Sequence, residues 1–276
     1  ASAPADAGLA RTLRGFARTD GRKGIRNVLV VAYLVECAHH VAREIAAPLR
    51  ERGVHLIGFP GCYPNPYALR MMEQLCTHPN VGGALLVSLG CEGFDKRHLA
   101  RAVEASGRPV HLLGIQDTGG TRATIAAGRA WVERTLAALA AQAPVLMRID
   151  ELTVGTICGG SDATSGLTAN PAMGVAFDLL VAAAARTIFE ETGELIGMEH
   201  LMAARAATPA LGDELKRTVA KAATYYATLG YASFAPGNAD GGLTTIEEKS
   251  LGAYAKSGQS RIDGIVKPGI APPRQG

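Results

Sequence analysis

The chain has 276 residues, of which 47% are hydrophobic and 19% are charged. A chain of this size and composition can bury a large core, so the sequence excludes disorder as its main state and predicts one large domain or two smaller ones. No apolar run approaches the roughly 18 residues of a membrane span. The first ten residues carry neither a signal peptide nor a transit peptide pattern, so we expect a soluble, cytoplasmic protein with no membrane partner.

The net charge of +3 comes from 28 basic and 25 acidic residues, and no basic block is long enough to form a nucleic-acid groove, which excludes nucleic acid as a partner. Five cysteines, an odd number at irregular spacing, predict reduced thiols rather than a secreted disulfide framework. The 33 glycines exceed the usual share of about 7%. Many of them gather in short polar loops, where the backbone can approach a ligand closely.

The first half alternates between two kinds of pattern. Apolar runs predict strands at 27–35, 54–57, 84–89 and 110–115. Amphipathic stretches predict helices at 38–52, 67–77, 96–106 and 121–142. Strict alternation predicts a parallel sheet covered on both faces, in which ligands bind at the carboxyl ends of the strands. We therefore expect the four loops that follow these strands to converge on one edge of the sheet.

The pattern changes at Ala143-Pro144, which places a domain boundary near 145–150. The second half predicts strands at 152–157 and 187–190, helices at 171–185, 198–207, 212–229 and 246–255, and a turn-rich loop at 235–242. We expect an α/β fold with two Rossmann-like lobes of mostly parallel sheet. The predicted parts are a disordered segment at 1–14, a first α/β domain at 15–147, and an incomplete second lobe at 148–276.

Cys62, Cys91 and Cys158 each belong to a Gly-Cys or Cys-Gly pair just beyond a predicted strand. For a single cysteine, a buried structural role is the usual interpretation. The recurrence of the pattern favours three soft ligands that meet at one point. Cys76, inside a predicted helix, is expected in the core, and the role of Cys37 stays open.

The loop at 158–171 brings hydroxyls, a carboxylate and an amide to the start of a helix. Helix N-terminal N–H groups with nearby hydroxyls suit a carboxylate or a polyol. The alternative is a capped helix start in which Thr168 or Asn170 only satisfies the backbone. The candidate ligand-binding side chains from this loop are Ser161, Ser165, Thr168 and Asn170, and Asp162 is a candidate catalytic group.

Two further groups of charged residues are candidates. Glu191, Glu194, Glu199 and His200 follow a predicted strand; such residues can act as acid, base or metal ligand, and we expect half or more of them to be surface charge. Ahead of the first strand, Arg22 and Arg26 can pair with a substrate carboxylate in a fork geometry. The alternative for residues 19–27 is a turn that leads into the strand.

Five segments, in this order, resemble motifs of the altronate dehydratase and galactarate dehydratase family: GFARTDGRKGIRN (15–27), LGCE (89–92), CGGSD with SGLTANP (158–171), PGNADGGLTT (236–245) and EKSLG (248–252). The resemblance extends from about residue 14 to the end. It implies a carbon–oxygen lyase (hydro-lyase) that dehydrates a sugar acid such as altronate or galactarate to a 2-keto-3-deoxy acid. It also implies a divalent metal. We expect Fe²⁺, and an iron–sulfur cluster is the alternative.

The resemblance assigns site residues as well. It does not identify the base, which we expect among Glu191, His200 and Lys249, and Asp162 is a further expected catalytic residue. The expected metal ligands are Cys62, Cys91, Glu92 and Cys158. The expected substrate-binding residues are Arg22, Arg26, Asn27, Ser161, Ser165, Thr168, Asn170 and Asn238.

Three departures from the family pattern stand out. Residues 58–63 read GFPGCY, without the histidine that relatives have before this cysteine, so the substrate stays open. The small N-terminal domain of fused dehydratases is missing, and we expect it on a separate subunit. The sequences of family members also continue past the position that corresponds to Gly276, so we expect this chain to be truncated. The alternatives are the large subunit of a sulfo-lyase acting on sulfolactate and, in another class, a non-catalytic anion-binding or scaffold subunit. In each case we expect a homo-oligomer with a small-molecule hydroxy-acid ligand.

Overall fold

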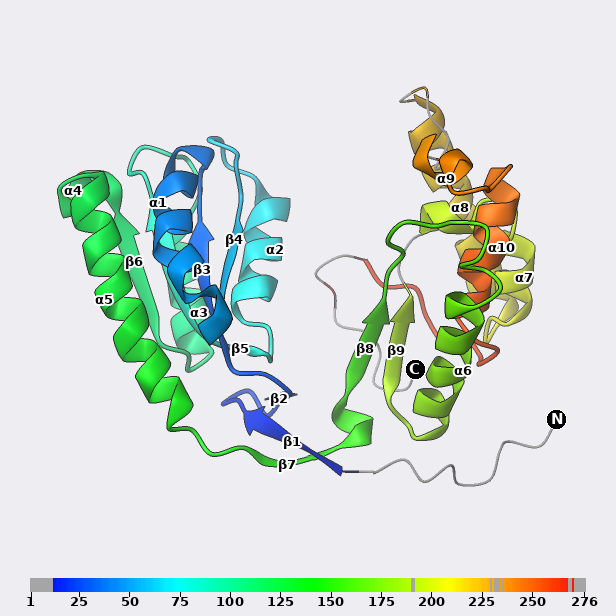
Figure 1. Ribbon diagram of the computed structural model, residues 1–276, viewed down its shortest axis with the longest axis horizontal. Helices are drawn as coiled ribbons and strands as arrows, with labels where there is room; N and C mark the ends of the chain where they lie inside the picture. Colours follow the sequence, from blue (N-terminus) through cyan, green and yellow to red (C-terminus); the bar gives the residue numbers. More distant parts are fainter. Residues whose placement is uncertain are drawn as a thin grey trace. The chain divides into compact units, whose positions relative to one another are not determined.

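The computed structural model describes residues 12–189, 192–228, 230, 234, 236–267 and 270, and the chain divides into two compact units (Figure 1). The first unit comprises Thr12–Met147, and the second begins at Arg148. Helices and parallel strands alternate along the chain, which confirms the α/β fold class. Across these residues, no helix combines the length and the apolar character that a membrane span requires.

The first unit contains most of the strands. They are β1 (Thr12–Ala17), β2 (Lys23–Gly24), β3 (Val28–Tyr33), β4 (Val54–Gly58), β5 (Val81–Ser88), β6 (Val110–Gly114) and β7 (Val145–Arg148). The helices are α1 (Glu36–Ala46), a 3-10 helix (Ala47–Arg52), α2 (Pro66–Cys76), α3 (Lys96–Ala105), α4 (Ile115–Thr118) and α5 (Thr121–Ala140). The eight elements expected between residues 27 and 142 are all present, with ends displaced by a few residues.

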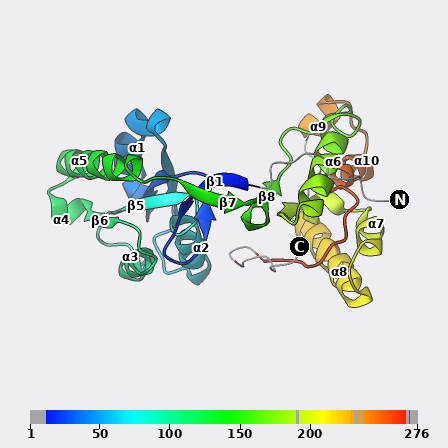
Figure 2. The ribbon, with the colours of Figure 1, turned by 90° about the horizontal axis from the view of Figure 1, so that it is seen from below.

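Strands β3, β4, β5 and β6 form a parallel sheet in the order β4-β3-β5-β6. Helices α1 and α5 cover one face and α2 and α3 cover the other (Figure 2). Since both faces are covered, the central strands need apolar side chains in both directions. All eight residues of β5 are accordingly buried.

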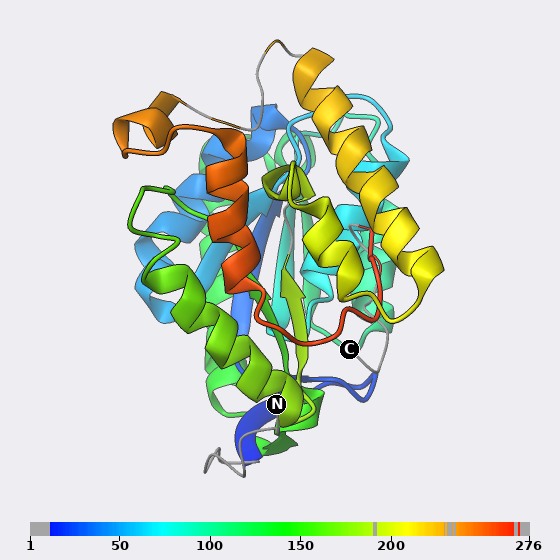
Figure 3. The same cartoon turned by 90° about the vertical axis from the view of Figure 1, so that its right-hand side faces the viewer.

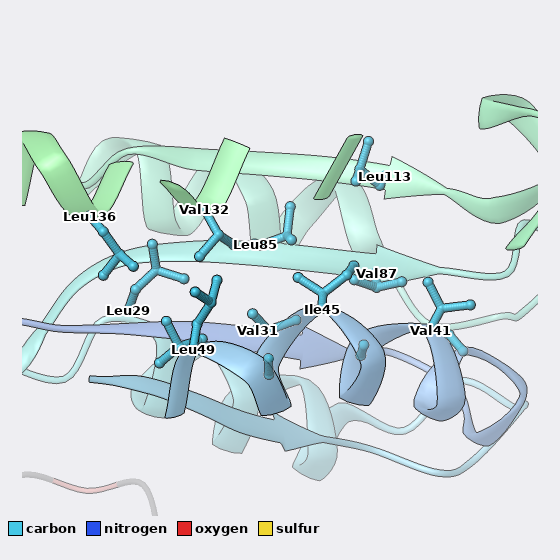
Figure 4. Close-up of a cluster of buried hydrophobic side chains, with 14 of the residues drawn as sticks. Leu29, Val31, Val41, Ile45, Leu49, Leu85, Val87, Leu113, Val132 and Leu136 are labelled. Atoms are coloured by element: carbon cyan, nitrogen blue, oxygen red, sulfur yellow. The ribbon is translucent and has the colours of Figure 1, made fainter. Parts of the chain in front are cut away.

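The core between the sheet and its α1/α5 face fixes these strands (Figure 4). Side chains of α1 (Val41, Ile45) and α5 (Val132, Leu136) pack on one face of the sheet. They contact the alternate residues of the central strands, Leu29, Val31, Leu85 and Val87. Burial of each such side chain contributes about 1.5–3 kcal/mol, so this packing sets the strand register. Because the four strands are parallel, all four carboxyl ends lie at one edge.

Strand β3 lies between β4 and β5, so the chain crosses to one side of β3 first and to the other side next. The loops after β3 and β5 consequently lead to helices on opposite faces. In open parallel sheets this reversal of strand order is where ligands bind. We therefore expect a ligand site of this unit to lie beside the residues that follow β3 and β5.

A small sheet of β2, β1 and β7, in that order, was not expected from the sequence. Strand β1 begins at Thr12, inside the segment 1–14 that was expected to be disordered, while residues 1–11 lie outside the described residues. The strands are short, and β7 follows β1 by more than 120 residues. A pairing over such a distance leaves no local pattern in the sequence.

The second unit contains a βαβ arrangement and several more helices. Its elements are a 3-10 helix (Ile149–Glu151), β8 (Thr153–Thr156), α6 (Ala169–Ala182), β9 (Arg186–Phe189), a 3-10 helix (Thr192–Leu195), α7 (Glu199–Ala204), α8 (Pro209–Thr228), α9 (Pro236–Asp240) and α10 (Ile246–Lys256). Strands β8 and β9 pair in parallel, and α10 packs beside α6 (Figure 3). The stretch 235–242, expected to be a loop, includes the short helix α9.

Candidate functional site

Backbone hydrogen bonds tie together the four loops at the carboxyl edge of the first sheet. The Glu36 N–H donates to the Pro60 carbonyl (3.1 Å), and the Gly93 N–H donates to the Cys62 carbonyl (2.8 Å). The Gln116 N–H donates to the Leu89 carbonyl (3.1 Å). The convergence of loops expected from the sequence is therefore confirmed.

Three cysteines of this unit, Cys37, Cys62 and Cys91, expose their thiols. Cys76 is fully buried in α2, and burial raises the pKa of its thiol to about 12. This confirms Cys76 as a core residue. Cys62 and Cys91 lie on neighbouring loops, since the Cys62 carbonyl accepts the bond from Gly93.

Glu92, expected as a metal ligand, is engaged inside the protein. Its side chain is fully buried, Oε1 accepts a hydrogen bond from Ser88 Oγ (2.5 Å), and Oε2 accepts one from the Gly90 N–H (2.9 Å). Lys96 Nζ lies 3.3 Å from Oε1. Burial alone would raise the pKa of Glu92, but the bonds from Ser88 and Gly90 and the charge of Lys96 lower it. A carboxylate held in this way does not fit the role of a metal ligand.

Arg22, Arg26 and Asn27, expected to bind substrate, lie before the first residue of β3 and so at the amino edge of the sheet. Arg22 donates to Asp20 and to the Thr77 carbonyl. Asn27 accepts from Arg18 and donates to the Leu139 carbonyl. Within this unit, these three residues are therefore at the opposite edge from Cys62 and Cys91.

The second unit holds a buried charged cluster, which we call the Glu194 cluster: Cys158, Glu194, Lys249 and Lys256. Glu194 Oε1 lies 3.3 Å from Lys249 Nζ, and Oε2 lies 3.3 Å from Lys256 Nζ. Lys256 Nζ also lies 2.6 Å from Cys158 Sγ. The side chains of Glu194, Lys249 and Lys256 are only 8%, 11% and 6% exposed. Charges this buried require partners, and these residues provide them for one another.

The chain brings the cluster together by simple geometry. Cys158 follows β8 by two residues, and Glu194 follows β9 by five. Because β8 and β9 are parallel, both residues leave the same edge of the sheet. Lys249 and Lys256 are seven residues apart on α10, which is close to two helical turns, so both lie on the same side of that helix.

Cys158 does not fit a metal site as it stands. Burial and a hydrogen bond with Glu194 raise the pKa of its thiol, while Lys256 opposes this only in part. A metal ligand must be the thiolate, and an ammonium group 2.6 Å from Sγ would repel a cation. Within the described part of each unit, no three Cys, His, Asp or Glu side chains gather so that they could hold a metal ion.

A cavity of about 600 Å³ lies against α6 and α10 in the same unit. Lys249 lines it, so this lysine joins the buried Glu194 to the cavity. Four of the expected site residues also line the cavity: Ser161, Asp162, Ser165 and Asn170. The structure thus brings together five expected residues from two separate segments of the sequence, 158–171 and 248–252.

Most of these polar side chains also hold the loop in shape. Asp162 Oδ1 accepts hydrogen bonds from the backbone and the hydroxyl of both Thr164 and Ser165. These bonds, that of the Thr164 hydroxyl first, lower the pKa of Asp162, so it is a carboxylate that organises the turn. Asn170 donates to the Gly252 carbonyl (2.9 Å), and buried Asn238 donates to the Ser161 carbonyl (3.2 Å).

The remaining expected residues of this unit either do not line the cavity or lie outside the described part of the chain. Thr168 Oγ1 donates to the Thr164 carbonyl within its own loop. His200 is exposed on α7, whereas Glu194 is buried. Glu191 lies outside the described residues. Sequence reasoning missed Lys256 altogether; its seven-residue spacing from Lys249 was the available signal.

Comparisons with known proteins agree on one family. Residues 15–140 match the model described as "D-galactarate dehydratase/Altronate hydrolase, second domain", and residues 149–276 match "D-galactarate/Altronate dehydratase, C-terminal". Altronate dehydratase of Bacillus subtilis is 30% identical over 94% of this chain, and galactarate dehydratase (L-threo-forming) of Escherichia coli is 33% identical over 96%. The (2R)-sulfolactate sulfo-lyase subunit beta of Chromohalobacter salexigens is 33% identical over 93%. The chain spans 55%, 56% and 67% of the lengths of these three relatives, respectively.

Proposed function

Since the chain belongs to the D-galactarate/altronate dehydratase family, we propose that it is part of a metal-dependent hydro-lyase that removes water from a sugar acid such as altronate or galactarate. The observation that carries the proposal is that Lys249 Nζ connects buried Glu194 to the cavity. Proton transfer needs a group that reaches the substrate, here Lys249, and the buried carboxylate of Glu194 stabilises the charged form of that group. A cytoplasmic location belongs to the same proposal, since the five cysteines are free thiols.

Lys249 serves both proton transfers in this scheme. Lys249 first releases the proton of its resting ion pair with Glu194 to solvent. The neutral amine then takes the proton from the carbon next to the substrate carboxylate, and the electron pair of that C–H bond passes into an enediolate. Glu194, 3.3 Å away, stabilises the ammonium group that forms. Lys249 then gives the proton to the hydroxide that leaves the neighbouring carbon. The enol product tautomerises to a 2-keto-3-deoxy acid, and Lys249 returns to its neutral form.

The loop at the cavity supplies polar contacts for the rest of the substrate. The hydroxyls of Ser161 and Ser165 and the amide of Asn170 suit the hydroxyl groups of a sugar acid. Asp162 keeps this loop in position through four hydrogen bonds on Oδ1. In this proposal it positions the substrate-binding hydroxyls and transfers no proton.

The divalent metal remains part of the proposal, and it rests on Cys62 and Cys91, whose exposed thiols lie on adjoining loops. When bound, Fe²⁺ would supply Lewis acidity. The test is the iron content of protein purified without oxygen. We expect Cys62→Ser and Cys91→Ser each to lower it while Cys37→Ser does not, and unchanged iron in both would remove these cysteines from the account.

The alternative is a sulfo-lyase that acts on sulfolactate together with a separate small subunit, since that relative is named as one subunit of its enzyme. It is favoured by the coverage of that relative, at 67% the largest share among those compared. A third outcome is a subunit that binds the acid and does not catalyse. Homo-oligomerisation is part of each alternative.

The experiment supplies the purified protein with ferrous iron under anaerobic conditions and offers altronate, galactarate and sulfolactate in turn. A 2-keto acid without sulfite supports the dehydratase, release of sulfite supports the sulfo-lyase, and binding without turnover supports the non-catalytic subunit. We expect Lys249→Met to lower kcat about a hundredfold or more. Lys216→Met, on an exposed position of α8, is the matched control. Wild-type kcat in the Lys249→Met variant would disprove the assignment.

A further inference from the structure

Lys96, at the start of α3, makes three contacts across the turn that carries Cys91. Its Nζ donates to Ser88 Oγ (2.9 Å) and to the Gly90 carbonyl (3.1 Å), and lies 3.3 Å from Glu92 Oε1. Ser88 is the last residue of β5, and Glu92 lies on the far side of the turn. The ammonium group of Lys96 therefore contacts residues on both sides of Cys91 in this turn.

The position of Lys96 is electrostatically unfavourable for the helix itself. A cation in the first turn of a helix is repelled by the positive end of the helix dipole, and α3 begins with two cations, Lys96 and Arg97. The buried carboxylate of Glu92 offsets this repulsion for Lys96 only. The contact with the turn therefore explains why a lysine is tolerated here.

The turn that Lys96 joins is narrowly defined. Gly90 adopts φ 135°, a conformation that side chains disfavour, and a Cβ at this position would overlap the side chain of Gln116. Its N–H is bonded to Glu92 Oε2. Three residues further on, the Gly93 N–H donates to the Cys62 carbonyl. A change in the turn would thus be passed to the loop that carries the second exposed thiol.

We infer that Lys96 is a positioning residue for the two proposed metal-binding cysteines: by joining Ser88, Gly90 and Glu92 it fixes the Cys91 turn and, through Gly93, the Cys62 loop. The inference rests on the proposed function only in taking Cys62 and Cys91 as metal ligands. The role of Glu92 follows from it. Glu92 supports the turn from inside the protein and is not itself exposed to a ligand.

The test compares hydrogen exchange of individual amides in the wild type, Lys96→Met and Arg97→Met. The control removes a cation from the same first turn of α3, at an exposed position. We expect exchange of the Gly90 and Gly93 amides to rise about tenfold or more in Lys96→Met. Amides within β3 and β5 should keep wild-type protection, and Arg97→Met should match the wild type throughout. A role in overall stability alone would raise exchange across the whole sheet.

Wild-type protection at Gly90 and Gly93 in Lys96→Met, or loss of protection spread evenly over the sheet, would overturn the inference. If Lys96→Met does not fold, Glu92→Gln replaces it, since this change keeps the size of the side chain and removes the charge that Lys96 contacts. The same local rise is expected, and its absence would overturn the inference equally. Because hydrogen exchange needs no substrate, failure here is distinct from failure of the proposed lyase activity.

Discussion

Replacing Glu194 by glutamine tests the central feature of the site, the carboxylate shared by two buried lysines. The change keeps the side-chain size and removes the negative charge that faces Lys249 and Lys256, both at 3.3 Å. These lysines are 11% and 6% exposed, so water cannot replace the lost partner. Removal of one partner from a buried ion pair costs about 3–5 kcal/mol. We expect Glu194→Gln to lower the free energy of unfolding of the second unit by about 4 kcal/mol.

The assay is urea denaturation followed by far-ultraviolet circular dichroism, because the single tryptophan, Trp131, lies in the first unit. With a slope of about 2 kcal/mol per molar urea, the midpoint should fall by about 2 M. The control is Asp150→Asn, which breaks the exposed pair between Arg148 and Asp150 in the same unit. Exposed pairs contribute at most about 1 kcal/mol. If the loss in Glu194→Gln is no greater than the loss in Asp150→Asn, the cluster is not the buried charge network described here.

Two other predictions concern packing and pH. Gly174→Ala in α6 would place a methyl group against the carbonyl oxygen of Ala255, and we expect the free energy of unfolding in urea to fall by about 2 kcal/mol. Gly159→Ala, whose methyl group would meet open space, should be nearly neutral. Equal midpoints for the two variants would contradict the close packing of α6 and α10. Glu92 has a lowered pKa in the folded state, so its contribution to stability is present above its unfolded pKa of about 4.3 and is lost as the pH falls through the lower folded value. Acid titration of the unfolding midpoint should be flatter for Glu92→Gln than for the wild type over that range, and parallel curves would show that Glu92 is not held as described.

The site shows where reading a sequence reaches its limit. The resemblance singled out Lys249, Cys158 and Asp162, because their segments carry recognisable patterns. It did not reveal that Lys249 and Lys256 share Glu194, since the contact joins residues 62 positions apart in the chain. Glu92 shows the converse: its segment suggested a metal ligand, but its side chain turns inward to Ser88 and Gly90. A side chain's direction depends on packing, which sequence spacing does not encode.

The sequence by itself determined the alternating elements of the first unit and the edge at which its loops meet, because apolar periodicity and strand direction are local properties that repeat along the chain. It also determined the family, through five short segments in a fixed order. Only the tertiary structure decided the pairing of β1 with β7, the buried contacts of the Glu194 cluster and the inward turn of Glu92. Each of these features depends on contacts between residues that are distant in the sequence, or on which side chains become buried. Both are decided only when the chain folds.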